Sequence, residues 1–401
     1  MANGGSILIL CNFRNIRPKY LIDQETTLSW LVEVHARSES CKEGSSEKLQ
    51  PASASSDRIA RLMKRYGCSS EQIAVRGTEI CDFTHTDWEK MDLFHFRDGP
   101  FGPNMSQRSE QFSEISKRIC AQFFTPEITA PDHLVHVTCS GYISPSSAQE
   151  IVSKNNWHQK TVVTHAYHMG CYAALPAVRM AEGFLAKARL NSGGSRSDFR
   201  TDIFHTEVCS IHVQLQDHSP EQLVVQSLFA DGFIVYSAVH QEEVGRVNGA
   251  GLLVEALQEE IIPGTETSIT WDCSEWGMRM GLSSIVPEAI SSNLAAYMQR
   301  LCQRGNVSCE EICAKAVFAV HPGGPKIIDR IQALLGLRDE QLKASRHILK
   351  TCGNMSSATL PHVWENICAD SSVSDGTMVV SLAFGPGLCI SGATMRKIVN
   401  S

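Results

Sequence analysis

Short apolar runs alternate with longer helical patterns along most of the chain. The runs that resemble strands, several of them leading into turns, lie at residues 7–11, 133–142, 160–170, 201–215, 227–239, 314–325 and 377–398. The helical patterns between them lie at 106–124, 172–190, 286–305, 324–337 and 339–352. This alternation predicts an α/β fold whose strands are buried and largely parallel.

Two polar stretches interrupt the pattern. Residues 38–57 are rich in serine and nearly free of apolar side chains, which predicts a surface loop. Asp57 then has the position of a helix cap, and Gly67 that of a helix end. Glycine and proline punctuate residues 92–107, which predicts a second loop.

Composition and charge exclude several classes of function. The chain has 401 residues, of which 43% are apolar and 20% charged, as in soluble globular proteins. The net charge of −7 and the lack of a Lys or Arg block argue against nucleic-acid binding. No apolar run is long enough for a signal peptide or a membrane span, so we expect a cytoplasmic protein without a membrane span.

Fifteen cysteines occur without a C-x-x-C pair. We therefore expect free thiols in a reducing compartment, most of them packed in the core. The sequence H-x-x-H-x-x-C at His165, His168 and Cys171 is open to two interpretations, a metal site or a reactive cysteine. Strand residues three apart point to opposite faces, and structural zinc takes four ligands, so the reactive cysteine is favoured and no metal is expected.

Three polar residues beside glycines follow apolar segments. They are Cys171, His321 and Asn354. Side chains at the carboxyl ends of strands in an α/β sheet converge on one crevice. A Cys–His–Asn set without metal can perform acyl transfer, with Cys holding the acyl group and His and Asn donating to an oxyanion or enolate.

Cys171 precedes a buried helix. We expect the helix N-terminus and His321 to lower the pKa of Cys171 and to make it the most reactive of the cysteines. Gly170 permits the tight turn before it.

With these residues in place, the chain resembles a type III polyketide synthase, the chalcone synthase-like branch of the thiolase superfamily. "MGCYAALPAVRMAEG", "VFAVHPGGPKIID" and "CGNMSSATL" resemble the nucleophile, histidine and asparagine segments. "CSGYISP", "SLFADG", "VPEAI" and "AFGPG" occur in the expected order. The resemblance covers residues 5–399, and the segment around Cys171 is more similar to bacterial members.

The resemblance implies a role for each matched residue. Cys171 is the nucleophile, and His321 and Asn354 promote decarboxylation of a malonyl thioester. The substrate cavity is implied to hold Phe229, Met280, Trp271, Cys209, His212 and Ser356, of which Phe229 is a gatekeeper. The candidates for contacts to the CoA phosphates are Arg58, Arg61, Lys64 and Arg65.

Departures from the family pattern argue against the plant flavonoid substrate. Met280 replaces a second gatekeeper phenylalanine, and Trp271 replaces a cavity glycine. Cys209 and His212 occupy positions that are otherwise threonine, and Ala383 begins the loop usually written GFGPG. None of these changes touches the three catalytic positions.

The resemblance implies a thiolase fold with two βαβαβ halves, at residues 1–240 and 241–401, in a five-layered α/β/α/β/α core. It further implies a homodimer that uses acyl and malonyl thioesters of CoA or acyl carrier protein, without a cofactor. The implied product is a pyrone, resorcinol or phloroglucinol-type ring. The alternatives are a ketosynthase that performs a single condensation and a non-catalytic partner subunit.

Overall fold

One nine-stranded sheet forms the centre of the protein. The computed structural model describes residues 8–42, 53–97, 99–195, 197–247 and 249–400. The strand order is β11-β12-β13-β8-β1-β7-β6-β4-β5. In chain order these strands are β1 (Leu8–Ile16), β4 (His133–Thr138), β5 (Val162–Tyr167), β6 (Arg200–Glu207), β7 (Gly232–His240), β8 (Ala250–Ile261), β11 (Val317–Val320), β12 (Met378–Gly385) and β13 (Cys389–Val399).

The strand directions differ from the expectation of a largely parallel sheet. Only the pairs β11–β12, β4–β5 and β4–β6 are parallel in the described part of this sheet. The other five neighbouring pairs are antiparallel. The prediction was wrong because β12 and β13 are joined by a tight turn that is too short for a parallel crossover, and because β1 runs antiparallel to both of its neighbours, β7 and β8.

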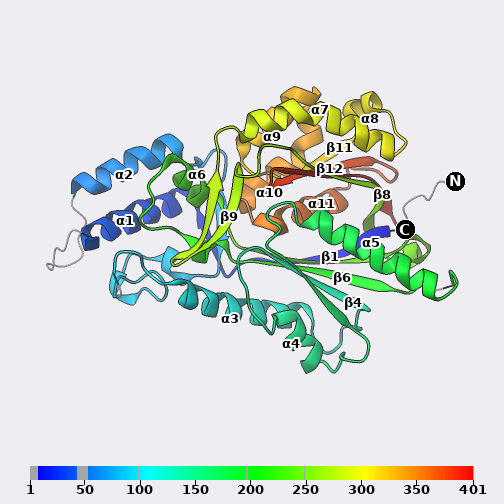
Figure 1. Ribbon diagram of the computed structural model, residues 1–401, viewed down its shortest axis with the longest axis horizontal. Helices are drawn as coiled ribbons and strands as arrows, with labels where there is room; N and C mark the ends of the chain where they lie inside the picture. The colour runs from blue at the N-terminus through cyan, green and yellow to red at the C-terminus, as the bar shows by residue number, and fades with distance from the viewer. Residues whose placement is uncertain (1–7, 43–52, 98, 196, 248, 401) are drawn as a thin grey trace.

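Helices cover the sheet in three layers, as Figure 1 shows. Helices α5 (Ala174–Asn191) and α11 (Thr359–Ala369) lie between the two ends of the sheet and contact strands from both. Helices α3 (Met105–Phe123) and α4 (Ser147–Lys154) cover one outer face. The other outer face is covered by α7 (Val286–Arg304), α8 (Cys309–Lys315), α9 (Pro325–Leu335) and α10 (Lys343–Cys352). The core thus has five layers, α/β/α/β/α.

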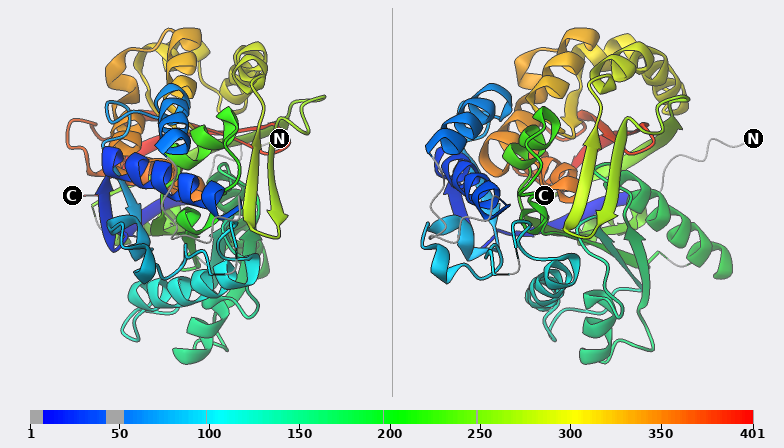
Figure 2. Two further views of the ribbon diagram at one scale, coloured as in Figure 1. Left: turned by 90° about the vertical axis from the view of Figure 1, so that its left-hand side faces the viewer. Right: turned by 60° about the vertical axis from the view of Figure 1, so that its left-hand side comes forward.

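A smaller group of elements stands beside this core. It contains α1 (Gln24–Lys42), α2 (Ser53–Tyr66), α6 (Pro220–Leu228), and the two-stranded sheets β2–β3 and β9–β10. Their strands are β2 (Tyr20–Asp23), β3 (Val75–Thr78), β9 (Ile269–Ser274) and β10 (Gly277–Leu282). Figure 2 shows the β9–β10 hairpin beside α6, which it contacts.

Short 3-10 turns complete the structure. They are η1 (Cys81–Thr84), η2 (Trp88–Lys90), η3 (Cys209–His212), η4 (Gln241–Arg246), η5 (Asp339–Leu342) and η6 (Ser356–Ala358). The run predicted as one strand at 201–215 therefore ends at Glu207 and continues as η3.

The predicted loop at 38–57 is wrong at both ends. Helix α1 continues to Lys42, and α2 begins at Ser53, so Asp57 lies within α2 rather than at its cap. The serines of α1 bond within the fold, because Ser38 donates to the carbonyl of Pro100 and Ser40 to that of Ala36. Residues 43–52 of the predicted loop lie outside the described residues.

Other predicted boundaries are confirmed. Helix α2 ends before Gly67 and α7 before Gly305. Helix α3 begins at Met105, inside the end of the predicted loop at 92–107 and one residue before the predicted helix, where Asn104 accepts from the backbone N–H of Gln107. Among the described helices, none combines the length and the apolar character that a membrane span requires.

Candidate active site

Cys171 lies in a tight turn between β5 and α5. The backbone reverses at His168 and Gly170, whose φ angles are 61° and 80°. A Cβ on Gly170 would lie 2.4 Å from Pro386 Cδ. Both the positive φ angle and this lack of space therefore require glycine at the position. The turn places the Cys171 thiol between the halves of the sheet.

His321 follows β11 directly. Its N–H donates to the carbonyl of Leu382 at 2.7 Å, which continues the pairing with β12 by one residue. The imidazole is buried, at 1% exposure, and neither ring nitrogen has a hydrogen-bond partner among the described residues. Buried polar groups are nearly always paired, so two unpaired nitrogens on one ring indicate a place for a ligand atom.

Asn354 is fixed by its backbone and by its side-chain oxygen. Its N–H donates to Leu228 and its carbonyl accepts from Ala230, at 3.0 and 2.8 Å. Its Oδ1 accepts from the N–H of Ser356 at 2.9 Å and from the hydroxyl of Thr359 at 3.3 Å. The amide NH₂ is therefore left as the donor.

A single cavity brings the three residues together. It has a volume of about 820 Å³ and is lined by Cys171, His321 and Asn354. Of the other predicted cavity residues, it is also lined by Phe229, Met280, Trp271, Cys209 and Ser356. The structure thus joins residues that are up to 183 positions apart in the sequence (171 to 354).

Burial decides the electrostatics of this cavity. It raises the pKa of Cys171 to about 12, an effect that side-chain hydrogen bonds between the sulfur and Ser356 and Asn354 oppose in part. The negative charge of Glu207 acts in the same direction as burial. Burial also lowers the pKa of His321 to about 3. The imidazole of His321 is therefore neutral and can accept or share a proton.

The expectation of a lowered Cys171 pKa is wrong for the thiol as an isolated group. Cys171 lies before the first turn of α5, and burial outweighs the helix N-terminus. Burial penalises isolated charges most, whereas transfer of the thiol proton to His321 would create two opposite charges in one cavity. The partnership of Cys171 with His321 stays a prediction.

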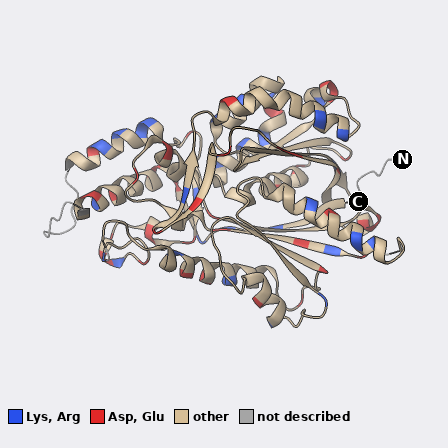
Figure 3. Cartoon of the chain, viewed as in Figure 1, with Lys and Arg blue, Asp and Glu red and all other residues tan. Residues whose placement is uncertain are grey.

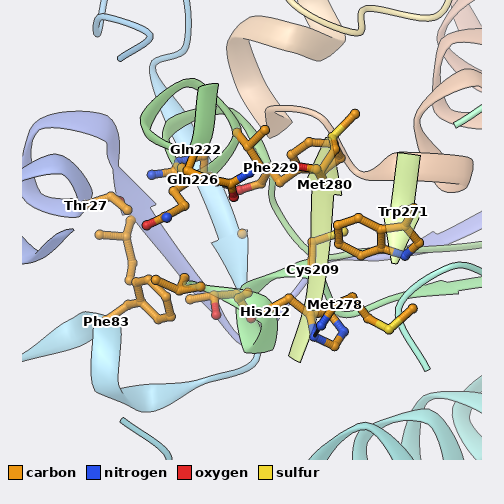
Figure 4. A pocket seen from close by; sticks show the side chains of 17 residues that line it. Thr27, Phe83, Cys209, His212, Gln222, Gln226, Phe229, Trp271, Met278 and Met280 are labelled. Atoms are coloured by element: carbon orange, nitrogen blue, oxygen red, sulfur yellow. Dashed lines mark hydrogen bonds between the residues drawn. The ribbon is translucent and has the colours of Figure 1, made fainter. Parts of the chain in front are cut away.

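Trp271 and Met280 face each other across the β9–β10 hairpin. Trp271 Nε1 donates to the carbonyl of Cys139 at 2.5 Å. Both residues also line a smaller pocket behind the main cavity, together with Cys209, Phe229 and His212 (Figure 4). The indole of Trp271 thus forms part of the wall between the main cavity and the smaller pocket.

His212 supports this wall instead of lining the main cavity. Its Nδ1 accepts from the N–H of Met278 at 3.1 Å, so its Nε2 is the donor to the carbonyl of Ser140 at 2.8 Å. Its ring meets Trp271 edge to face, with centroids 5.8 Å apart. His212 thus lines the smaller pocket and not the main cavity, and both of its ring nitrogens bond inside the protein.

The two histidines near Cys171 do not form a ligand set with it. His165 Nε2 lies 2.8 Å from the hydroxyl of Ser146. The His168 ring lies against Tyr142, with centroids 5.1 Å apart. His165 thus has a hydrogen-bond partner in Ser146, whereas His168 Nδ1 is buried and has no hydrogen-bond partner among the described residues.

Comparisons with known proteins agree with this geometry. A family model described as "Chalcone and stilbene synthases, C-terminal domain" matches residues 252–399. "Probable polyketide synthase 1" of Dictyostelium discoideum is 30% identical over 269 residues, 67% of this chain and 8% of that protein. "Type III polyketide synthase 21" of Oryza sativa subsp. japonica is 29% identical over 268 residues, 66% of each chain. The chain belongs to the type III polyketide synthase family.

The fold of this family member is confirmed over nearly its whole length. The crystal structure of PKS-I from the brown alga Ectocarpus siliculosus superposes with a TM-score of 0.78 at 20% identity. The match covers 99% of this chain and 100% of that one. The predicted thiolase fold is therefore correct. The chain spans 66% of the rice relative's length and 8% of the Dictyostelium relative's.

The basic helix α2 contributes less to the cavity than the resemblance implied. Figure 3 shows its Lys and Arg residues along an exposed helix. Arg65 lines the mouth of the cavity, whereas Arg61 and Lys64 are not among the lining residues. Arg58, which also lies away from the cavity, forms an ion pair with Glu39.

The structure adds two groups that the sequence analysis missed. Lys326, in the first turn of α9, is exposed and lines the same mouth as Arg65. Glu207 is fully buried behind Cys171, and its carboxylate accepts from the N–H of Cys139 and the hydroxyls of Ser140 and Ser357. Glu207 could have been predicted from the sequence, because it is a single carboxylate at the end of an apolar strand.

Proposed function

We propose that the protein is a malonyl-dependent polyketide synthase that performs decarboxylative Claisen condensation. One observation carries the proposal. The buried, unpartnered ring of His321 faces the same cavity as the Cys171 thiol and the fixed amide of Asn354. These are the donor, nucleophile and second donor that thioester condensation requires.

The first step loads the starter. The sulfur of Cys171 attacks the carbonyl carbon of an acyl thioester while its proton passes to His321. A new thioester forms on Cys171, the bond to the donor sulfur breaks, and the CoA thiol leaves with the proton. The neutral state of His321 allows it to accept this proton.

The second step extends the chain. A malonyl thioester binds with its thioester oxygen toward the ring N–H of His321 and the amide of Asn354. Its bond to the carboxylate breaks, CO₂ leaves, and the electron pair forms an enolate that the two donors stabilise. The enolate carbon attacks the acyl group on Cys171, the C–S bond breaks, and the thiolate of Cys171 is restored.

The cavity favours repeated extension over a single condensation. Its volume of about 820 Å³ lies toward the upper end of small-molecule sites and continues past Cys171 to Trp271 and Met280. We therefore infer a few extensions, followed by ring closure to a pyrone or resorcinol-type product.

The substrates of this proposal are CoA thioesters. Arg65 and Lys326 lie at the mouth of the cavity and are placed to bind the CoA phosphates. No step above uses a metal or an organic cofactor, because cleavage of the bond to the malonyl carboxylate leaves its electron pair on the carbon that forms the new C–C bond.

The proposal includes the organisation of the chain. The sheet order separates strands before residue 240 from strands after it, and we infer one half at 1–240 with Cys171 and one at 241–401 with His321 and Asn354. We also infer a homodimer. Strand β5 is an edge strand, and Val162 on it is 55% exposed, which suits burial by a second copy.

The test uses Cys171→Ala with the exposed Cys273→Ala as the matched control. Each protein is incubated with malonyl-CoA and a series of acyl-CoA starters, and both the intact protein and the products are weighed by mass spectrometry. We expect an acyl adduct and multi-ketide products from the wild type and the control, and neither from Cys171→Ala. Single β-keto products would instead indicate a single-condensation ketosynthase, and acylation of Cys171→Ala would disprove the nucleophile.

A further inference from the structure

A second group of ligand-type side chains lies outside the cavity, in the loop between β3 and α3. Cys81, Asp82 and His85 each offer one ligand atom, and these atoms lie within 4.8 Å of one another. Asp92 lies outside this set of mutually close atoms, but its Oδ2 is 2.9 Å from the sulfur of Cys81, which makes it the candidate for a fourth ligand. In Figure 1 this loop lies below α1, at the start of the cyan segment.

The separations suit a tetrahedral metal site. Zinc–sulfur and zinc–oxygen bonds of the usual lengths place their ligand atoms roughly 3.4–3.6 Å apart. The sulfur of Cys81 lies 3.6 Å from Oδ1 of Asp82. The contact to Asp92 is shorter and would open by about 0.7 Å on binding. Asp92 is exposed and belongs to a loop, so its carboxylate has room to move away from Cys81 by this distance.

The ring of His85 gives an independent sign of a ligand. Its Nδ1 is buried and has no hydrogen-bond partner among the described residues. The ring follows η1 directly, and the backbone at His85 is extended, with φ −150° and ψ 169°. A buried ring nitrogen without a partner, beside a thiol and two carboxylates, is typical of a metal ligand.

The surrounding structure holds the ligands in place. Asp82 is fully buried, and its carboxylate accepts from the N–H groups of Asp92, Leu93 and Phe94 at 2.9, 3.0 and 2.7 Å. Its Oδ1 carries one of these bonds and retains a second lone pair for a metal. These bonds tie the η1 turn to the segment that carries Asp92, so two parts of the loop are already joined.

Aromatic packing fixes the same turn from beneath. The ring of Phe83 lies against Trp30, with centroids 4.2 Å apart, and against Phe94 at 5.7 Å. The ligands therefore stand on a rigid base, while the exposed Asp92 leaves a path from solvent. A metal site needs both a fixed set of ligands and an entry path.

We propose that Cys81, Asp82, His85 and Asp92 form a binding site for Zn²⁺ or a similar divalent transition ion. One thiolate and one imidazole favour such an ion over Ca²⁺ or Mg²⁺, which take oxygen ligands. None of the four side chains lines the substrate cavity. The metal holds the loop between β3 and α3 and has no part in condensation.

Cobalt provides the direct test, because a thiolate bound to Co²⁺ absorbs in the near ultraviolet. The full-length protein is stripped with a chelator, dialysed and titrated with Co²⁺, as are Cys81→Ser, His85→Ala and the control Cys273→Ser, which removes an exposed thiol elsewhere. We expect saturation at about one Co²⁺ per chain in the wild type and the control. The charge-transfer band should vanish in Cys81→Ser, and affinity should fall at least about tenfold in His85→Ala.

A second measurement tests Zn²⁺ directly, through its effect on the melting temperature. Zn²⁺ should raise the melting temperature of the wild type and of Cys273→Ser but not that of Cys81→Ser. The reason is that a metal ion stabilises the folded protein only where it binds the folded state. Circular dichroism of the metal-free variants checks that they fold. An undiminished cobalt band in Cys81→Ser, or equal Zn²⁺ binding by wild type and Cys81→Ser, would overturn the site. Decarboxylation of malonyl-CoA should persist after chelation, so the result does not depend on the proposed function.

Discussion

The indole Nε1 of Trp271 donates a hydrogen bond to the backbone carbonyl of Cys139, and this bond fixes the wall of the cavity. Cys139 in turn accepts from the N–H of Gly170 through its sulfur, at 3.0 Å. Gly170, which precedes the proposed nucleophile Cys171, and Trp271, the largest side chain of the wall, are therefore joined through Cys139. The position of the wall relative to Cys171 is set by this connection.

Trp271→Ala should lengthen the products. Removal of the indole joins the main cavity to the smaller pocket behind it, so a growing chain gains room. Because Trp271 is only partly buried, we expect a loss of about 1–3 kcal/mol in the free energy of unfolding, below that of a fully buried Trp. Product masses across a series of starter lengths measure the effect.

Trp276→Ala is the matched control for the wall. Trp276 stacks on Phe101, with centroids 4.7 Å apart, and lines neither space. It should change stability without changing product length. Equal product lengths from Trp271→Ala and wild type would show that the indole does not limit extension.

His321→Ala should slow alkylation of Cys171. Without the imidazole nothing shares the thiol proton, and the buried thiol keeps its pKa of about 12. The thiolate fraction then rises about tenfold per pH unit, so labelling should be nearly absent at pH 7 and grow steadily up to pH 10. The wild type should label at pH 7 at least about tenfold faster, as measured by iodoacetamide and peptide mapping.

The exposed Cys273 serves as the internal reference for labelling. Its rate should be the same in both proteins. If Cys171 reacts equally fast with and without His321, the proton is not shared between them, and another group must activate the thiol.

His321→Ala and Asn354→Ala should each reduce decarboxylation of malonyl-CoA by roughly 10²-fold, since each removes one donor to the enolate oxygen. Release of labelled CO₂ measures this step without condensation. His158→Ala, an exposed histidine, is the control and should keep the wild-type rate. Wild-type CO₂ release from both site variants would contradict their role.

Arg65→Ala and Lys326→Ala should weaken CoA binding. Both cations lie at the cavity mouth, so their removal should raise the KM for malonyl-CoA by about 3–10-fold with little change in kcat. Arg61→Ala removes a charge of the same helix that lies off the cavity and should leave KM unchanged. A larger effect from Arg61 than from Arg65 would place the CoA phosphates elsewhere on α2.

The three residues proposed as catalytic, which line one cavity, could be picked out from sequence because their signals are local. Cys171, His321 and Asn354 each stand beside a glycine after an apolar segment, and the ends of such segments meet in α/β sheets. The α/β pattern and the ends of several helices were equally local, since they depend on periodicity and on glycines such as Gly305.

The tertiary structure decided what depends on distant contacts. The antiparallel pairing of β13 with β8 depends on how segments far apart in the sequence meet. The protonation of Cys171 depends on how deeply the turn is buried, and the role of His212 on two bonds to residues 66 and 72 positions away. The sequence by itself determined the α/β pattern and the three side chains proposed to carry the chemistry. Burial and long-range pairing determined their protonation, their partners and the shape of the cavity, because both exist only after the chain has folded.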